Sequence, residues 1–520
     1  MYIEPNTVIR LLTNCPLDNT YDHTIYFNDA DAQFSYFAGL TKYTLTKQTY
    51  QRVNRSRMRV QYKADDLYDC NYLMFQNTNF GNKWFYAFVK SVEYINNIVS
   101  EIEYEIDVMQ TWAFDYRLGE CFVDREHSAT DNVGDNLIPE RLEHGSYISD
   151  SLESDGFLYR SSIIVACTFD EQYKDVYGSY IAGIFSGLAF IKFPNTAGGA
   201  LEAAKFIADA GAKSDGIVSV FLIPSVLTEA TSGTPVRKTV TKQKSLTLKR
   251  ADGTEVKNKK LYTYPYNFLY VTNLQGTSAE YRYEFFNSEN CEFVLTGDVS
   301  VNPSVLLWPT NYKGVQSNLD EKICLSGFPQ LAYNTDTFKA WIAQNATSLG
   351  VNALSSAIGL GNQYAANQIS QQYAKVGDGA ARASLGAAML PLSAAASAAS
   401  LVAQVYEHTL VPMQAKGAGG STTLSACELM QFAFMTKHIQ PQFASIIDDY
   451  FTMYGYATHR LKIPNRNVRP YWTYTKTVGC VVHGSVPCDD MSKICKIFDN
   501  GITFWTNGNN IGNYSLDNSV

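Results

Sequence analysis

The sequence predicts a mainly β fold with a few helices, of the α+β class. Tyr and Phe, which favour strands, number 35 and 28 among the 520 residues. Apolar and polar residues alternate in several segments, and turn dipeptides such as Gly-Asn and Asp-Gly lie between them. A chain of this length exceeds one typical core, so we expect roughly two to four packed units.

Residues 1–130 are predicted to form an N-terminal β domain. An aromatic, β-branched segment from Trp84 to Val92 follows the turn signal Gly81-Asn82. From Ser100 to Val108, acidic and apolar residues alternate with period two, which puts the carboxylates on one sheet face. The acidic residues are Glu101, Glu103, Glu105 and Asp107. We expect them to face solvent or to line a channel without doing chemistry, since nothing in the sequence separates their pKa values.

Residues 131–335 are predicted to form a middle β-rich domain of unassigned function. A basic stretch runs from Arg237 to Lys260 and contains the hairpin signal Asp252-Gly253. Lys and Arg side chains can neutralise phosphates, which allows a nucleic-acid interpretation. No aromatic residue is interleaved for stacking on bases, so a solvated surface hairpin is the favoured interpretation.

Residues 336–430 form a long loop rich in Ala, Ser and Gly. No charged residue occurs in 340–374 or in 383–406, and only Lys375, Asp378 and Arg382 lie between these runs. The 24 residues of the second run would span about 36 Å as a helix, enough to cross a hydrocarbon core of about 30 Å. Its apolar side chains contribute about −2 to −4 kcal/mol to insertion, and its polar residues bring the net close to zero.

Two interpretations of this loop remain open from composition. It is either an Ala-rich helix pair packed on the protein itself, or a segment that stays sheltered and enters a membrane when released. On the second interpretation the membrane-penetrating, lipid-facing residues are Leu354, Ile358, Leu360, Leu385, Met389, Leu390, Leu392, Leu401 and Val402.

Residues 431–520 are predicted to be a compact C-terminal domain. Apolar residues from Phe443 to Tyr454 follow helical spacing, and Gly455 is placed to end that helix. A strand is expected over 471–482. A second helix is expected to start near Asp489 and to end at Asn500-Gly501.

Composition and missing motifs argue against most enzyme classes. The net charge of −8 gives no global attraction to nucleic acid. The ten cysteines form no CxxC pair, and the first residues lack the apolar core of a signal peptide, so we expect a protein made in the cytosol with reduced thiols. No Walker A loop, GxGxxG, GxSxG or HExxH motif occurs. We therefore assign no catalytic, cofactor-binding or metal-binding residue.

Several segments resemble one family in the same order along the chain. They are Tyr-Leu-Met-Phe-Gln-Asn at 72–77, Gly-Asn-Lys-Trp-Phe-Tyr-Ala-Phe-Val at 81–89, Glu-Ile-Asp-Val-Met-Gln-Thr-Trp at 105–112, Arg-Glu-His at 125–127, Ile-Phe-Asp-Asn-Gly-Ile-Thr at 497–503 and Ile-Gly-Asn-Tyr-Ser at 511–515. They are similar to the tail knob (distal tail tube) proteins of small short-tailed phages of the picovirus group.

This resemblance implies a structural protein of the virion tail tip and no enzyme. It implies a homohexameric ring of barrel-like domains, completed by 431–520, through which double-stranded DNA passes. The 350–406 segment would plug the tube and then penetrate the host membrane. The implied partners are other tail proteins (proximal tube and tip) and host membrane lipids. Two alternatives remain: a tail-associated host-receptor adhesin and a cell-wall hydrolase, for which two carboxylates suffice.

Overall fold

The computed structural model divides into two compact units that interleave along the chain. The residues it describes are 6–48, 56–78, 81–158, 160–168, 188–196, 198–199, 202–203, 206–207, 216–230, 234–300, 303–313, 322–328, 330–331 and 431–520. Unit 1 comprises 1–144, 249–261 and 441–520, and unit 2 comprises 145–248 and 262–440. The chain therefore passes between the two units four times.

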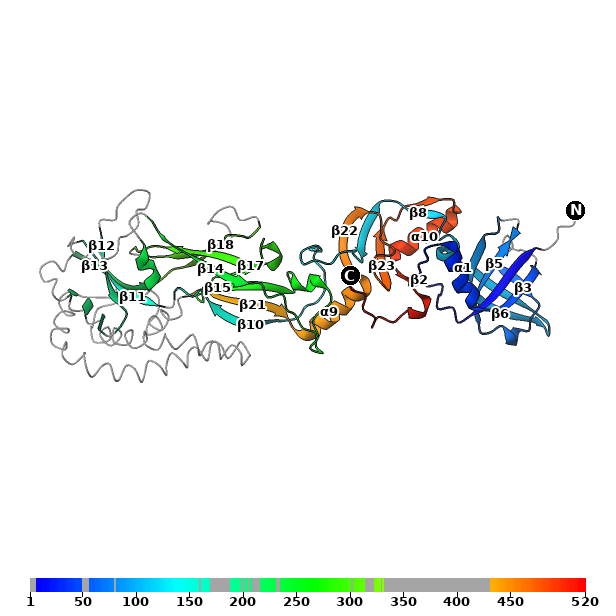
Figure 1. Ribbon diagram of the computed structural model, residues 1–520, viewed down its shortest axis with the longest axis horizontal. Coiled ribbons are helices and arrows are strands. Elements are labelled where there is room, and N and C mark those ends of the chain that lie inside the picture. The colour runs from blue at the N-terminus through cyan, green and yellow to red at the C-terminus, as the bar shows by residue number, and fades with distance from the viewer. Residues whose placement is uncertain are drawn as a thin grey trace. The chain divides into compact units, whose positions relative to one another are not determined.

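A six-stranded antiparallel sheet forms the N-terminal part of unit 1. Its spatial order is β3-β1-β5-β6-β7-β4. The strands are β1 (Thr7–Thr13), β3 (Thr41–Gln48), β4 (Arg57–Val60), β5 (Cys70–Asn77), β6 (Trp84–Asn96) and β7 (Val99–Ile106). In β7 the buried residues alternate with the glutamates, as the period-two pattern predicts. Figure 1 shows helix α1 (Ala30–Gly39) beside this sheet.

A second sheet of unit 1 joins N-terminal and C-terminal segments. Its order is β2-β25-β23-β9-β22, formed by β2 (His23–Ile25), β9 (Cys121–Glu126), β22 (Tyr456–Lys462), β23 (Trp472–Val478) and β25 (Ile502–Trp505). A two-stranded sheet pairs β8 (Tyr116–Leu118) with β24 (Val482–Gly484). The α-helices of this part are α2 (Val108–Thr111), α9 (Pro441–Tyr454) and α10 (Cys488–Asn500), and the short 3-10 turns of unit 1 are η1 (Ala64–Asp66), η6 (Lys259–Tyr262, which crosses the unit boundary) and η8 (Gly508–Asn510).

Aromatic packing forms the core of unit 1. The ring of Phe37 on α1 is fully buried, stacks on Tyr72 at 5.2 Å between centroids, and lies 4.8 Å from Tyr86. Asp29 caps α1 by accepting a hydrogen bond from the Ala32 N–H at 2.8 Å. In the second sheet Trp472 and Trp505 are both fully buried, 5.0 Å apart. Such large buried rings account for much of the apolar area removed from water.

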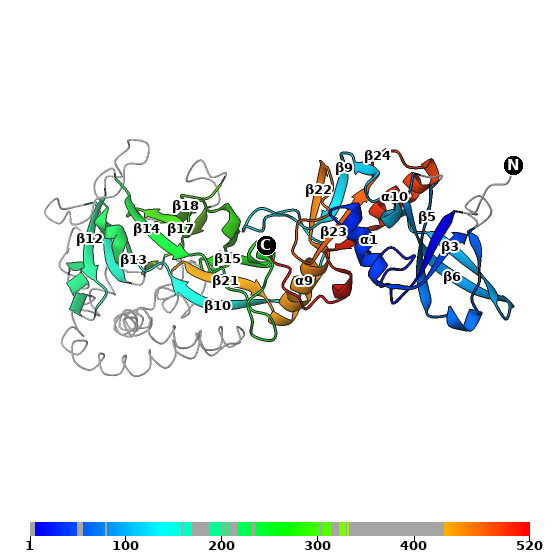
Figure 2. The ribbon, with the colours of Figure 1, turned by 45° about the vertical axis from the view of Figure 1, so that its right-hand side comes forward.

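The described residues of unit 2 form three four-stranded antiparallel sheets. Their orders are β10-β21-β15-β16, β12-β11-β13-β20 and β14-β17-β18-β19, and Figure 2 shows β10 beside β21. The strands are β10 (Tyr147–Ser154), β11 (Ser161–Cys167), β12 (Ala189–Pro194), β13 (Ile217–Pro224), β14 (Val236–Gln243), β15 (Asn267–Thr272), β16 (Ser278–Tyr281), β17 (Asn290–Gly297), β18 (Val305–Pro309), β19 (Ile323–Leu325), β20 (Gln330–Leu331) and β21 (Ala433–Ile439), with 3-10 turns η5 (Ser225–Glu229) and η7 (Tyr283–Phe285). The unit has its own apolar core.

The mainly β prediction is confirmed. The two predicted C-terminal helices are present as α9 and α10, and Gly455 ends α9 with a φ of +65°. A Cβ at that position would lie 2.2 Å from the Glu126 carbonyl oxygen, so the site requires glycine. The predicted strand 471–482 is shorter, because β23 ends at Val478 and a turn with Gly479 at φ +68° follows.

The sequence analysis predicted four consecutive domains, 1–130, 131–335, 336–430 and 431–520. The compact unit 1, in contrast, contains three segments that are separated in the chain. The loop 336–430 lies outside the described residues. Within the part of the chain that the structure describes, no helix is both long and apolar enough to span a membrane.

We expect Phe37→Ala to destabilise unit 1 by about 3–5 kcal/mol, because it leaves a cavity among stacked rings. Tyr68, whose side chain is 66% exposed, provides the control, and Tyr68→Ala should change stability by no more than about 0.5 kcal/mol. Urea unfolding followed by near-UV circular dichroism measures both. Similar destabilisation by the two substitutions would show that the rings around Phe37 are not the core.

Candidate functional site

The predicted acidic strand is neutralised by neighbouring cations. The Arg57 guanidinium on β4 lies 3.2 Å from the Glu101 carboxylate and 3.0 Å from that of Glu103. Arg59 also pairs with Glu101, at 3.0 Å. The Arg57 and Arg59 hydrogen bonds hold the pKa of Glu101 below its ordinary value, with the bond from Arg59 contributing most. Glu101 therefore stays ionised, in a network in which Arg57 also lies 3.6 Å from the Glu93 carboxylate.

Glu105 is bound by two lysines. Lys90 on β6 lies 2.8 Å from its carboxylate, and Lys493 of α10 forms a second ion pair. Burial raises the pKa of Glu105, but the hydrogen bonds from Lys493 and Lys90 outweigh burial and bring it to about 2. The side chain thus ties a helix of the C-terminal segment to the N-terminal sheet.

Asp107 does not belong to the same face, because β7 ends at Ile106. Its carboxylate is buried and caps α2 by accepting hydrogen bonds from the N–H groups of Met109 and Gln110 at 3.0 and 3.1 Å. The Tyr72 hydroxyl donates a further bond at 2.8 Å. Burial raises the pKa of Asp107 to about 6, although these hydrogen bonds lower it.

The expectation that the four residues Glu101, Glu103, Glu105 and Asp107 face solvent or line a channel is wrong for Asp107, which is buried, and stays a prediction for the three glutamates, which lie on the outward face of β7. Three of them are paired with Arg or Lys, and the fourth is buried as a helix cap. The alternation identified the outward positions of β7 correctly, but the partners come from β4, β6 and α10.

A buried polar cluster surrounds the Arg125-Glu126-His127 motif. Glu126 is bound by Lys462 at 2.5 Å, and Arg125 pairs with the buried Glu140. The His127 Nδ1 atom accepts a hydrogen bond from the Tyr474 N–H at 2.8 Å. Burial, aided by nearby Arg469, lowers the pKa of His127 to about 3, so the imidazole is neutral. The motif acts as a structural hydrogen-bond site.

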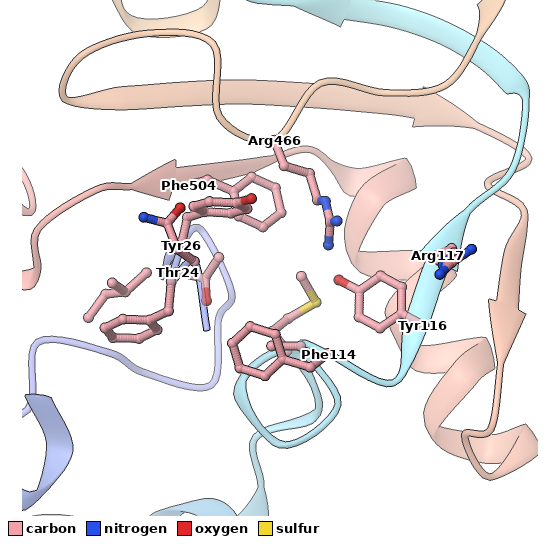
Figure 3. Close-up of a pocket in the computed structure, with 12 residues that line it drawn as sticks. Thr24, Tyr26, Phe114, Tyr116, Arg117, Arg466 and Phe504 are labelled. Carbon is pink, nitrogen blue, oxygen red and sulfur yellow. The ribbon is translucent and has the colours of Figure 1, made fainter. Parts of the chain in front are cut away.

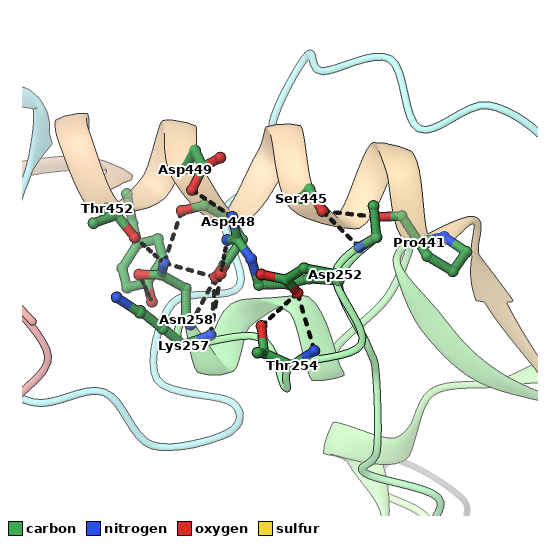
Figure 4. Close-up of polar contacts among 12 residues, drawn as sticks. Asp252, Thr254, Lys257, Asn258, Pro441, Ser445, Asp448, Asp449 and Thr452 are labelled. Atoms are coloured by element: carbon green, nitrogen blue, oxygen red, sulfur yellow. Dashed lines mark hydrogen bonds and ion pairs between the residues drawn. The ribbon is translucent and has the colours of Figure 1, made fainter. Parts of the chain in front are cut away.

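Asp448 of α9 anchors the segment 249–261 within unit 1 (Figure 4). Its fully buried carboxylate lies 2.5 Å from the Arg250 guanidinium. It also accepts hydrogen bonds from the backbone N–H of Lys257 at 3.1 Å and from that of Asn258 at 3.0 Å. The Asn258 side-chain amide donates to the same carboxylate at 2.9 Å. One anion thus satisfies several buried donors.

Lys260 holds the end of the same segment. Its side chain is 3% exposed and lies 2.6 Å from the Glu140 carboxylate. Burial lowers the pKa of Lys260, whereas the charge of Glu140 opposes that shift. Because Glu140 binds both Lys260 and Arg125, it joins the 249–261 segment to β9.

The basic stretch from Arg237 to Lys260 matches in part the solvated hairpin that the sequence favoured, since residues 251–255 are exposed. Its first half belongs to strand β14, which pairs with β17. The Asp252-Gly253 turn is present, with Gly253 at φ +85° and a Lys249–Glu255 bridge beside it. Arg250 and Lys260, however, point into buried ion pairs. The sequence composition could not predict these ion pairs, because both acidic partners lie more than a hundred residues away in the chain.

The nine predicted membrane-penetrating residues, Leu354, Ile358, Leu360, Leu385, Met389, Leu390, Leu392, Leu401 and Val402, lie outside the described residues. Among the residues that are described, no group of three or more His, Cys, Asp or Glu side chains is placed to hold a metal ion.

Two family models match the chain. The model of the C-terminal domain of the Bacillus phage phi29 tail knob protein gp9 matches residues 233–519, more than half of the chain. The model of the N-terminus of caudoviral major tail proteins matches residues 5–117. Together they reach into both compact units.

Individual relatives match over nearly the full length. The tail knob protein gp9 of Bacillus phage PZA and that of Bacillus phage phi29 are each 25% identical, covering 99% of this chain and 98% of the relative. Among solved structures, the tail knob protein gp12 of bacteriophage C1 superposes with a TM-score of 0.61 at 14% identity, covering 98% of both chains. That likeness shows a shared fold.

We expect Asp448→Ala to destabilise unit 1 by about 3–5 kcal/mol, because the Arg250 charge and the donors of Lys257 and Asn258 lose their acceptor in a buried place. Asp449 is the matched control. It neighbours Asp448 and also pairs with Arg250, but its side chain is 61% exposed, so Asp449→Ala should cost no more than about 1 kcal/mol. Urea unfolding measures both, and limited proteolysis should cut within 249–261 only in Asp448→Ala. Equal stability of the two variants would refute the anchor.

The pH dependence of stability should change in Asp107→Asn. Because the folded-state pKa of about 6 lies above the ordinary 3.8, the stability that Asp107 contributes is present below about pH 4 and is lost as pH rises through 6. The amide keeps an acceptor for α2 and cannot ionise. The melting temperature of the variant relative to the natural protein should therefore rise between pH 4 and 7.

Exposed Asp31 in the first turn of α1 supplies the control for this series. Asp31→Asn removes a carboxylate at an exposed position, and its melting temperatures are compared over the same interval. A flat difference for Asp107→Asn would show that Asp107 does not titrate there.

Proposed function

The chain belongs to the family of the phage phi29 tail knob protein gp9, and on that premise we propose that it forms the distal tail tube of a short-tailed phage. In this proposal copies of the chain assemble into a ring, taken to be a homohexamer, that adjoins other tail proteins, and DNA leaves the virion through the lumen. The loops within 350–406 plug the tube and then enter the host membrane. The relatives are structural tail proteins by name, which agrees with a non-enzymatic role.

Open sheet edges support assembly into a ring. β3 and β4 are the outermost strands of the six-stranded sheet, and β22 is the outermost strand of the five-stranded sheet. The outer backbone groups of an edge strand can pair with a strand of another subunit. Closed rings satisfy such edges without leaving a free end, and cyclic symmetry is the usual result.

The composition of the loop supports the membrane role and is the observation that carries it. The uncharged run 383–406 is long enough to cross a bilayer as a helix. Its insertion free energy lies near zero, so a single copy is not committed to the membrane. Several loops presented together by one ring would add their weak preferences.

Dye release from liposomes tests the proposal. We expect the intact protein to release dye and a variant lacking 350–406 to release much less, since the apolar segment is gone. Negative-stain electron microscopy should show the same rings for both proteins, because the deletion removes none of the described helices and strands. Assays at neutral and acidic pH examine Asp378, whose protonation would remove a charge that costs about 2.5–3.5 kcal/mol at a bilayer centre.

The two parts of the proposal fail separately. Equal leakage from both proteins would exclude the loop as the penetrating segment. A strictly monomeric particle at high concentration, even when the other tail proteins are added, would exclude the ring. Rings without leakage would leave a tube that does not act on membranes.

A further inference from the structure

A pocket of about 250 Å³ lies in unit 1. Its lining comes from β2 and the residues after it, from α2 and the segment that leads into β8, from the loop before β23, and from β25. The lining residues that the argument uses are Tyr26, Phe114, Tyr116, Arg117, Arg466 and Phe504. Figure 3 shows Arg466 reaching into the space, with the Tyr116 hydroxyl directed toward its guanidinium.

Arg466 is held between aromatic rings. Its guanidinium carbon lies 5.6 Å from the Tyr116 ring centroid and 5.9 Å from that of Tyr26. Among the described residues, neither Arg466 nor Arg117 forms an ion pair with a carboxylate. The ring contacts and a hydrogen bond to the Tyr116 hydroxyl orient the Arg466 guanidinium and leave its other donors free for a planar acceptor.

The lining of the pocket is positively charged. It contains no acidic residue, and its cation is Arg466, since the Arg117 side chain is exposed and points away from the space in Figure 3. Asp107, whose charge acts on the neighbouring Tyr116, is already bonded to Tyr72 and α2. Burial raises the pKa of Tyr116 to about 12, although the Arg466 charge lowers it, so its hydroxyl stays protonated near pH 7. An entering anion would therefore find positive charge and no competing carboxylate in the lining.

The size and walls of the pocket restrict what it can hold. A volume of about 250 Å³ lies below the range of about 300–1,000 Å³ typical of small-molecule sites. It suits a group the size of one side chain. Phe114, which is 45% exposed, and Phe504 offer apolar contact for a short stem, while Arg466 offers a fork that matches a carboxylate.

We propose that this pocket binds a side-chain carboxylate, Asp or Glu, from a neighbouring protein subunit in the tail, with Arg466 as its counter-ion. DNA is the weaker candidate, because binding to its backbone relies on several cations set along successive phosphates. From the proposed function this inference takes only that the chain has protein neighbours. Its test involves neither rings nor membranes, so the pocket proposal and the proposed function can fail independently.

Probe binding to the full-length protein tests the pocket. Saturation-transfer NMR with 3-phenylpropionate, which joins a carboxylate to an apolar stem, should show binding, and the neutral 3-phenylpropionamide should bind about tenfold more weakly. Arg466→Met should remove the preference for the carboxylate, and Arg466→Lys should keep part of it. Arg460, an exposed arginine outside the pocket, is the matched control, and Arg460→Met should bind as the natural protein does.

Several results would overturn the proposal. Equal binding of the acid and the amide would show that the pocket does not select a carboxylate, and this comparison holds even if Arg466→Met fails to fold. Unchanged binding in a folded Arg466→Met would show that the guanidinium only packs against the rings. Stronger displacement of the probe by phenyl phosphate or by an oligothymidylate than by N-acetylglutamate would assign the pocket to phosphate instead.

A dilution series identifies which subunit supplies the carboxylate. Probe binding that weakens as the protein concentration rises supports a second copy of this chain as the occupant. Binding that does not depend on protein concentration, but is lost when another tail protein is added, supports that protein as the occupant. The proposal fails if neither condition displaces the probe.

Discussion

The buried carboxylate of Asp448 is the constraint on which the organisation of unit 1 depends. The chain passes between its two units four times, and 249–261 is a short return into unit 1 with no strand of a large sheet to hold it. Asp448 accepts hydrogen bonds from both halves of that segment, through Arg250 and Asn258. If an apolar residue replaced one partner, the remaining buried polar groups would lose a hydrogen bond or ion pair. The contacts of Asp448 therefore also specify where the segment 249–261 lies.

The sequence predicted local structure well where periodicity was strong. The alternation in β7 and the helical spacing in α9 both appear in the structure because each pattern describes a buried face. Which distant segments share a sheet could not be predicted. The pairing of β9 with β22 and β23, or of β10 with β21, joins residues about three hundred positions apart, and one sequence contains no signal for such contacts.

The charge pattern of the sequence predicted which face of a strand a residue lies on, but it did not predict its ion-pair partner. The glutamates of β7 point outward as predicted, yet their neutralising cations come from β4, β6 and a helix near the C-terminus. Arg250 and Lys260 stand in a stretch whose composition suggests solvent, and both are paired inside. Arg466 gave no signal at all, because the loop before β23 has neither period nor motif. Only the fold brings Tyr26 and Tyr116 to its sides.

Internal pairing of cations has a consequence for a protein proposed to conduct DNA. Adhesion to DNA grows with the number of free cations that meet phosphates and release counterions. In unit 1, Arg57, Arg59, Lys90 and Lys493 are already committed to carboxylates of the same chain. A surface whose cations are paired internally would offer DNA few free cations, and it avoids self-repulsion among crowded subunits. An arginine left without a carboxylate in a recessed pocket is then better placed to recognise a protein neighbour than to retain passing DNA.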